Sequence, residues 1–173
     1  MELVPTTTEV LACDRDKDYP CLAHLLGAAI PASWPPPLLD HEALVQFVAL
    51  ATAGNDPFFV SYYWIQKGPQ PGFQTLIGSG GACSGETPGT VIIGYSVLDE
   101  FQNRGLATEA LRAMIPAIFS WRGVERITAA TYPSLTASIR VLEKCGFTCA
   151  GETVGGGGIE EGTLLYILER ENA

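Results

Sequence analysis

Histidine and positive charge are both scarce in this sequence of 173 residues. It has 2 histidines and 10 lysines and arginines against 19 aspartates and glutamates, which gives a formal net charge of −9 at pH 7. A chain this acidic repels phosphate backbones, so nucleic-acid binding is not expected. Two histidines also exclude chemistry that needs several imidazoles. The acidity fits a cationic partner such as an amine, and it fits ordinary solubility equally well.

Patterns typical of disulfide-rich, metal-binding and membrane-inserted chains are also missing. The 5 cysteines are odd in number and none shows C-x-x-C spacing, so neither a disulfide framework nor a zinc site is expected. No apolar run is long enough to span a bilayer, and no basic-then-apolar start indicates a signal peptide. The sequence therefore predicts a cytoplasmic protein that binds neither metal nor membrane.

What the sequence does contain is enough apolar material for a core. Hydrophobic residues make up 47% of the chain and charged residues 17%, which excludes disorder as a description of the whole. The length is that of one domain, and neither a repeat nor a domain boundary is visible. We therefore expect a single domain over residues 1–173.

The N-terminal half is predicted to be mixed in structure. Apolar residues at helical spacing indicate helices, aromatic and β-branched runs indicate strands, and three successive prolines indicate a stiff, extended connector. In order, we expect a strand at Glu9–Cys13, a helix at Tyr19–Ile30, the connector at 31–37, a helix at His41–Ala53 between Asp40 and Gly54, and strands at Phe58–Trp64 and Leu76–Cys83.

The C-terminal half alternates between strands and helices. We expect strands at Val91–Leu98 and Arg126–Tyr132, a helix at Gly105–Trp121 that Pro116 kinks or ends, a helix at Ser134–Lys144 capped by Ser134, and a hairpin of 147–152 with 163–169. Hairpins combined with crossover helices predict a mixed sheet in an α/β or α+β domain.

The segment 102–108 follows the strongest predicted strand and opens a helix. The first N–H groups of a helix have no intrahelical partner and lie at the positive end of its dipole, so they can hold a phosphate. Gly105 lets backbone approach such a group closely, and Arg104 can add a charge-assisted bond. A single glycine at a helix start is nevertheless common in ordinary turns, and neither G-x-G-x-x-G nor a P-loop is present.

Two motifs at the right separation resemble the GNAT N-acetyltransferases. Gln102-Asn103-Arg104-Gly105-Leu106-Ala107 matches the Q/R-x-x-G-x-G/A motif of that family, and the stretch 137–147 resembles its second cofactor motif. The Trp34-Pro35 pair and the wording ASIRVLEK are most similar to the branch that contains ribosomal-protein alanine N-acetyltransferases. The resemblance implies a mainly antiparallel mixed sheet of about six to seven strands, flanked by helices, in which 91–98 and 126–132 form a splayed parallel pair.

The resemblance also implies an acetyltransferase that moves an acetyl group from acetyl-CoA to a primary amine by direct attack on the thioester. Backbone of Val97 and Leu98 would hold the pantetheine arm, and the N–H of Leu98 would polarise the thioester carbonyl. The residues implied for the pyrophosphate are Gln102, Asn103, Arg104, Gly105, Leu106, Ala107 and Thr108.

Proton transfer is assigned by the same resemblance. Ser138 is the candidate catalytic residue on the thiolate side, with Tyr132 and Tyr166 as alternative acids. A hydroxyl that bonds back to a carbonyl of its own helix is the other reading of Ser138.

The base stays open, because the family's usual glutamate position holds Ile92. Glu160, Glu161 or a water could serve instead. The second motif normally carries Asn where this sequence has Leu135, so one amide contact is lost.

The acceptor is the least determined part of the reaction. A protein N-terminal α-amine fits the branch, whereas a small-molecule amine fits the family more widely. A non-catalytic acyl-CoA-binding module is the alternative from another class. A homodimer is also left open, with the aromatic strand Phe58–Trp64 as a pairing surface.

Overall fold

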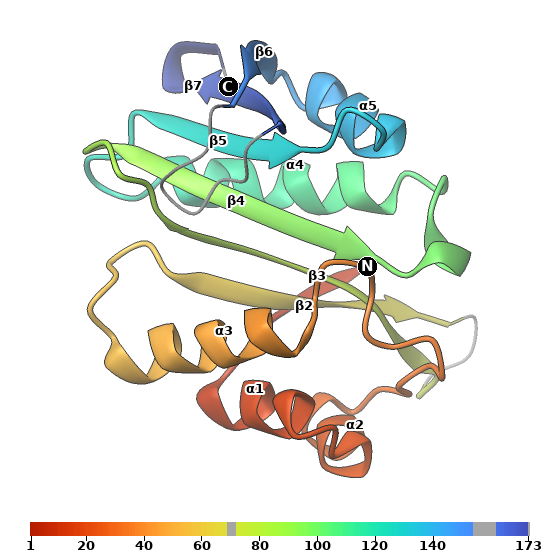
Figure 1. Cartoon of the computed structure of the whole chain (residues 1–173). Coiled ribbons are helices and arrows are strands. Elements are labelled where there is room, and N and C mark those ends of the chain that lie inside the picture. The colour runs from red at the N-terminus through yellow and green to blue at the C-terminus, as the bar shows by residue number, and fades with distance from the viewer. Residues whose placement is uncertain (69–71, 154–161, 173) are drawn as a thin grey trace. The chain divides into compact units, whose positions relative to one another are not determined.

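The computed structural model describes residues 1–68, 72–153 and 162–172, and within them the strands form one seven-stranded sheet in the order β1-β2-β3-β4-β5-β7-β6. The elements are β1 (Glu2–Pro5), α1 (Thr8–Arg15), α2 (Tyr19–Leu26), α3 (His41–Ala53), β2 (Val60–Lys67), β3 (Gln74–Ser84), β4 (Thr90–Val97), η1 (Asp99–Phe101), α4 (Leu106–Phe119), β5 (Arg126–Thr131), α5 (Thr136–Lys144), β6 (Thr148–Glu152), β7 (Leu164–Glu169) and η2 (Arg170–Asn172) (Figure 1).

The sheet is mostly antiparallel with one parallel pair. β1 runs antiparallel to β2, and β7 runs antiparallel to both β5 and β6. β4 and β5 are parallel, with Thr90–Ile92 opposite Arg126–Thr128, and both strands continue beyond these three pairs. The predicted fold class, including its parallel pair, is confirmed.

By its internal contacts the chain forms two compact units. The first contains 1–81 and 95–106, and the second contains 82–94 and 107–173.

The first unit contains three helices, and their capping residues explain where each helix begins. Thr7, Asp18 and Asp40 accept hydrogen bonds from the first turns of α1, α2 and α3, respectively. The bounds predicted for α3 are confirmed at both ends. α2 is shorter than predicted, because Gly27 takes the left-handed conformation and ends it after Leu26.

The strand predicted at Glu9–Cys13 is wrong, because these residues lie inside α1. Thr7 caps the helix and Glu9 lies in its positive first turn. Val10 and Leu11 are buried in the core of the first unit, where α1 packs beside α2 and α3. Packing therefore overrides the weak strand preference of this short apolar run.

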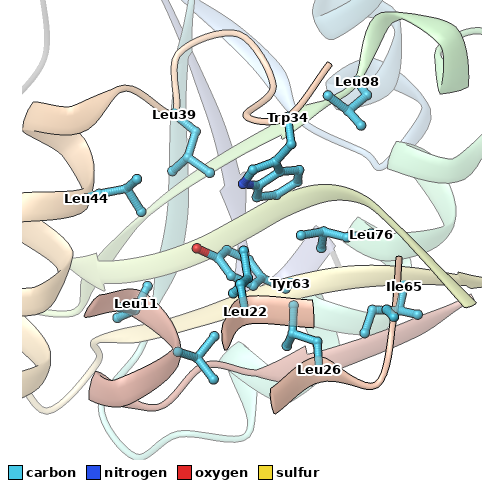
Figure 2. Close-up of a cluster of buried hydrophobic side chains, with 12 residues drawn as sticks. Leu11, Leu22, Leu26, Trp34, Leu39, Leu44, Tyr63, Ile65, Leu76 and Leu98 are labelled. Carbon is cyan, nitrogen blue, oxygen red and sulfur yellow. The ribbon is translucent and has the colours of Figure 1, made fainter. Parts of the chain in front are cut away.

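That core is built around two large aromatic side chains. Trp34 and Tyr63 meet edge to face with their centroids 5.4 Å apart. Figure 2 shows them surrounded by aliphatic side chains from the helices and strands; the buried cluster is Val10, Leu11, Leu22, Leu26, Ala28, Trp34, Leu39, Leu44, Tyr63, Ile65, Leu76 and Leu98.

The connector between α2 and α3 is not extended as predicted. The N–H of Trp34 donates to the carbonyl of Pro31, and the N–H of Leu39 donates to that of Pro36, so the segment folds into two turns. In the second turn Pro37 occupies the position that favours proline, and Leu38 follows with φ +68°. The prolines thus bend the connector and bring Trp34 inward.

The proposed pairing surface at Phe58–Trp64 is also wrong. β2 lies between β1 and β3, so both of its hydrogen-bonding edges are already used. Tyr63 and Trp64 are completely buried.

The second unit is organised by α4, which lies alongside β4 and β5 (Figure 1). Its buried face repeats at helical spacing and consists of Ala110, Leu111, Met114, Ile115, Ile118 and Phe119. The helix continues through Pro116 to Phe119. Arg170 donates to the carbonyl of Val124, and its guanidinium lies over the Phe119 ring. The predicted hairpin of β6 with β7 is confirmed.

Ser134 does not cap α5 as predicted. The cap position is held by Leu135, whose side chain can accept no hydrogen bond, and the helix begins at Thr136.

Cys13 and Cys21 form a disulfide between α1 and α2, whereas the number and spacing of the cysteines predicted no disulfide framework.

Among the described residues no group of three or more potential ligands could hold a metal ion. The helices described here include none that is both long and apolar enough to cross a bilayer.

Candidate functional site

The loop that joins β4 to α4 is held in shape by its own side chains. Gln102 donates from Nε2 to the carbonyl of Val97 at 3.0 Å and to the carboxylate of Asp99 at 2.9 Å. Arg104 donates to the carbonyl of Glu100 at 2.6 Å, and its guanidinium lies 5.3 Å from the centre of the Phe101 ring. In this structure these two side chains, which the resemblance implies at the pyrophosphate, brace the loop.

With the side chains folded back, the backbone of the loop is what faces outward. Asn103 and Gly105 are both exposed and both have positive φ, at 59° and 79°. A Cβ at Gly105 would meet no atom within 4 Å. Alternation of ordinary and left-handed residues turns successive N–H groups toward one side, which is the geometry of an anion-binding nest.

α4 begins directly after Gly105. The N–H groups of Leu106, Ala107 and Thr108 lie in its first turn, where they have no partner in the helix and share its partial positive charge. The side chains of these three residues are half-buried, and the helix is 14 residues long. The segment 103–108 therefore combines backbone donors with open space at Gly105, and both are features expected of a pyrophosphate site.

The end of β4 places its backbone groups differently from the prediction. The N–H of Leu98 donates to the carbonyl of Ile77 on β3 at 2.9 Å, so it is not available to polarise a thioester carbonyl. Because N–H groups alternate in direction along a strand, those of Val97 and Tyr95 point away from β3. The pantetheine contacts implied for Val97 therefore fit the strand, whereas Leu98 faces the wrong edge.

Two hydrogen bonds fasten the connector to this region, and sequence reasoning missed both. Ser96 on β4 donates its hydroxyl to the carbonyl of Pro37, and Ser33 donates to the carboxylate of Glu100 in η1. The bond from Ser33 lowers the pKa of Glu100. Serines separated from their partners by some 60 residues give no local signal, so only the fold reveals them.

In the second unit, α5 packs against the start of α4. Cys145 Sγ lies 3.9 Å from the carbonyl oxygen of Thr108, and Arg112 donates to the carbonyl of Lys144 at 3.4 Å. Burial raises the pKa of the Cys145 thiol. Ser138 is half-buried and lies seven residues before Cys145, hence on the same side of α5. Seven residues are about two helical turns, so Ser138 lies roughly 10 Å along α5 from the contact between Cys145 and Thr108.

The other candidates for proton transfer are less favourably placed. Tyr166 is 3% exposed and lies in the core, where burial raises its pKa and Cys149 is its hydrogen-bond partner. Tyr132 is half-buried just after β5. Glu160 and Glu161 lie outside the described residues. Ile92, at the position of the family's usual glutamate, lies on β4 in the pairing with β5.

A mixed sheet with one parallel pair, followed by an open glycine loop at a helix start, agrees with the fold that the resemblance implies. Residues 15–148 match the model of the acetyltransferase (GNAT) domain, so this chain belongs to the GNAT acetyltransferase family. No curated protein matches the sequence significantly.

Solved structures with this fold include acetyltransferases of different acceptors. An aminoglycoside acetyltransferase AAC(6')-Ib, bound to coenzyme A and kanamycin, is 19% identical with a TM-score of 0.67 over 98% of this chain and 95% of its own. The ribosomal-protein-S5-alanine acetyltransferase of Vibrio fischeri is 19% identical, with a TM-score of 0.61 over 98% and 93%. RimJ of Mycobacterium smegmatis in complex with CoA-disulfide is 20% identical, with a TM-score of 0.60 over 98% and 81%.

Proposed function

We propose that this protein transfers an acetyl group from acetyl-CoA to a primary amine. Family membership makes it a transferase of acetyl groups. The observation that supports the donor most directly is the exposed backbone of Asn103–Gly105, with two left-handed residues and open space at the Gly105 Cβ, directly before α4. An uncharged nest at a helix start suits a pyrophosphate in a protein that is otherwise acidic.

Each part of the donor has a counterpart in the chain. The N–H groups of 103–108 would bind the pyrophosphate. The N–H group of Val97, which points away from β3, would bind the pantetheine arm as a neighbouring strand does. The braces from Gln102 and Arg104 keep these donors in place before binding, which reduces the conformational entropy lost on association.

The thioester supplies an activated acetyl group, and the chain must orient it and manage protons. Ser138 would deliver a proton toward the departing sulfur, because it is the half-buried hydroxyl that the second cofactor motif supplies on α5. The acceptor ammonium must lose a proton before attack, and water is the base we propose.

An amine acceptor agrees with the relatives of this fold. The names of two of them specify an aminoglycoside and an alanine of a ribosomal protein, and both acceptors present amino groups. We propose a protein N-terminal α-amine as the first acceptor to test and a small-molecule amine as the second.

Two measurements on the purified protein test this proposal. Acetyl-CoA at 100 times its dissociation constant should raise the free energy of unfolding by about 2.7 kcal/mol. Release of CoA thiol should then depend on an added amine, with alanine-initiated peptides compared with kanamycin. Stabilisation without thiol release from any amine would indicate a non-catalytic acyl-CoA-binding module, and no stabilisation at millimolar acetyl-CoA would refute the donor assignment.

A further inference from the structure

The first unit contains a pocket of about 250 Å³ where α1 ends, α2 and α3 begin and the connector passes. Its apolar walls are formed by Tyr19, Pro35, Leu39 and Leu44. No residue of 97–106 lines it, so it is separate from the loop assigned to acetyl-CoA. This volume is enough for a ligand of one small ring and a short substituent.

Asp14 lines the pocket and is 2% exposed. Its Oδ1 accepts from Trp34 Nε1 at 2.8 Å, and its Oδ2 accepts from the hydroxyl of Tyr63. Figure 2 shows the indole nitrogen and the phenol oxygen on the same side of the cluster. Both of these groups donate to the Asp14 carboxylate. Two rigid, buried donors therefore hold Asp14 in one orientation.

Both donors to Asp14 are neutral, and the nearby cations are directed elsewhere. Arg15 forms two hydrogen bonds of 2.8 Å with Asp16. Lys17 and His41 are exposed at the rim. The part of the chain that the structure describes contains no ion pair to Asp14. A buried carboxylate with only neutral partners is poorly compensated, and burial accordingly raises its pKa.

The charged groups that line the pocket include the carboxylates of Asp14 and Asp40 and the cations of Arg15 and Lys17. Asp40 also caps α3 by accepting from the N–H of Ala43 at 2.9 Å. Tyr19, Pro35, Leu39 and Leu44 supply apolar walls, which suit an organic body better than a hydrated metal ion. Tyr19 also offers an aromatic ring, against which an ammonium ion is favourable.

We infer that this pocket binds a small organic ammonium ion, with its nitrogen near Asp14 and its apolar body against Leu39 and Leu44. The attraction is strong because the carboxylate lies in a medium of low dielectric constant. Asp14 disfavours an anion at its buried position, and a neutral molecule of the same shape gains only the apolar contacts. Such a site goes beyond the proposed transfer reaction, because it requires neither acetyl-CoA nor catalysis.

The test uses the full chain without acetyl-CoA and compares benzylammonium with benzyl alcohol, which has the same shape and no charge. Titration is followed calorimetrically and through the indole ¹H–¹⁵N resonance of Trp34, assigned with Trp34→Phe. We expect benzylammonium to bind at least about tenfold more tightly than benzyl alcohol and to shift that resonance. Equal affinities, a Trp34 resonance that does not move, or no saturable binding up to about 10 mM benzylammonium would each overturn the inference.

Matched variants assign the preference to Asp14. Asp14→Asn keeps an acceptor for Trp34 and removes the charge, so the preference for benzylammonium should fall to within about twofold. Asp16→Asn, an exposed change on the same helix, should preserve it. A preference that survives in a folded Asp14→Asn variant would refute the role of Asp14. Should Asp14→Asn not fold, Leu44→Phe fills the pocket and should abolish binding of both compounds, whereas unchanged binding would place the site elsewhere.

Gly105→Ala separates this inference from the proposed function. It alters the acetyl-CoA loop and should leave benzylammonium binding unchanged. Loss of acetyl-CoA binding together with intact benzylammonium binding is the expected result, and joint loss would contradict the existence of a separate site.

Discussion

Substitution of Gly105 by alanine offers a sharp test of the acetyl-CoA loop. Gly105 has φ +79°, and a Cβ there would meet no protein atom within 4 Å. The change therefore costs only the left-handed conformation of a residue with a Cβ, about 1–2 kcal/mol of unfolding free energy. For a chain of this length that corresponds to a decrease of roughly 2–8 °C in Tm.

The effect on acetyl-CoA should be larger than the effect on stability. The new methyl group would occupy the space in which a phosphate oxygen approaches the backbone. Loss of one hydrogen bond to a charged group costs about 1.5–3 kcal/mol, which weakens binding roughly 10- to 150-fold. Isothermal titration calorimetry with acetyl-CoA measures this directly.

Gly54→Ala is the matched control. Gly54 ends α3 with φ +58° and likewise has no atom within 4 Å of a Cβ, so the conformational cost should be similar. Both variants should lose comparable stability, and only Gly105→Ala should lose affinity for acetyl-CoA. Equal dissociation constants for the two variants would refute the argument that phosphate binds at the Gly105 backbone.

Three further outcomes are expected. Ser138→Ala should slow amine-dependent thiol release about 100-fold with little change in acetyl-CoA affinity, and an unchanged rate in a thiol-trapping assay would remove Ser138 from catalysis. Joint replacement of Cys13 and Cys21 by serine should lower the free energy of unfolding by about 2.5 kcal/mol, because their disulfide closes a short loop. Dithiothreitol should destabilise the wild type and leave the double variant unchanged. Equal destabilisation of both proteins by dithiothreitol would contradict the disulfide. The pKa of Asp14 is raised above its usual 3.8 by burial, so its contribution to stability is greatest below that pH and declines as the pH rises through the raised value; urea unfolding should show the wild type losing stability relative to Asp14→Asn as the pH rises above 3.8, and a constant difference would be contrary to this.

The features that could be predicted from the sequence are those that neighbouring residues determine. Asp40 and Gly54 gave both ends of α3, because a capping carboxylate and a left-handed glycine act within one turn. The loop at 102–108 was predicted from the family motif that it resembles, and Gly105 does lie directly before α4. The roles of Gln102 and Arg104 at the pyrophosphate stay predictions, and the hydrogen bonds that these side chains make to carbonyls of the folded loop could not be inferred from the sequence.

The features that could not be predicted depend on residues far apart in the chain. Asp14 lies in a charged stretch, DRDKD, which is typical of a solvated helix end, and Trp34 lies among prolines that indicate an exposed connector. The burial of each residue is stabilised by the other. The indole N–H of Trp34 donates to the Asp14 carboxylate, whose burial would otherwise be unfavourable, and the carboxylate gives the buried indole N–H its acceptor. Tyr63 on β2, 49 residues after Asp14, donates the second hydrogen bond to this carboxylate. Burial of the Asp14 carboxylate is unfavourable in itself, and Asp14 also lines a pocket. The binding role that we infer for Asp14 could therefore be recognised only from the fold, and the Trp34 indole resonance tests it most directly.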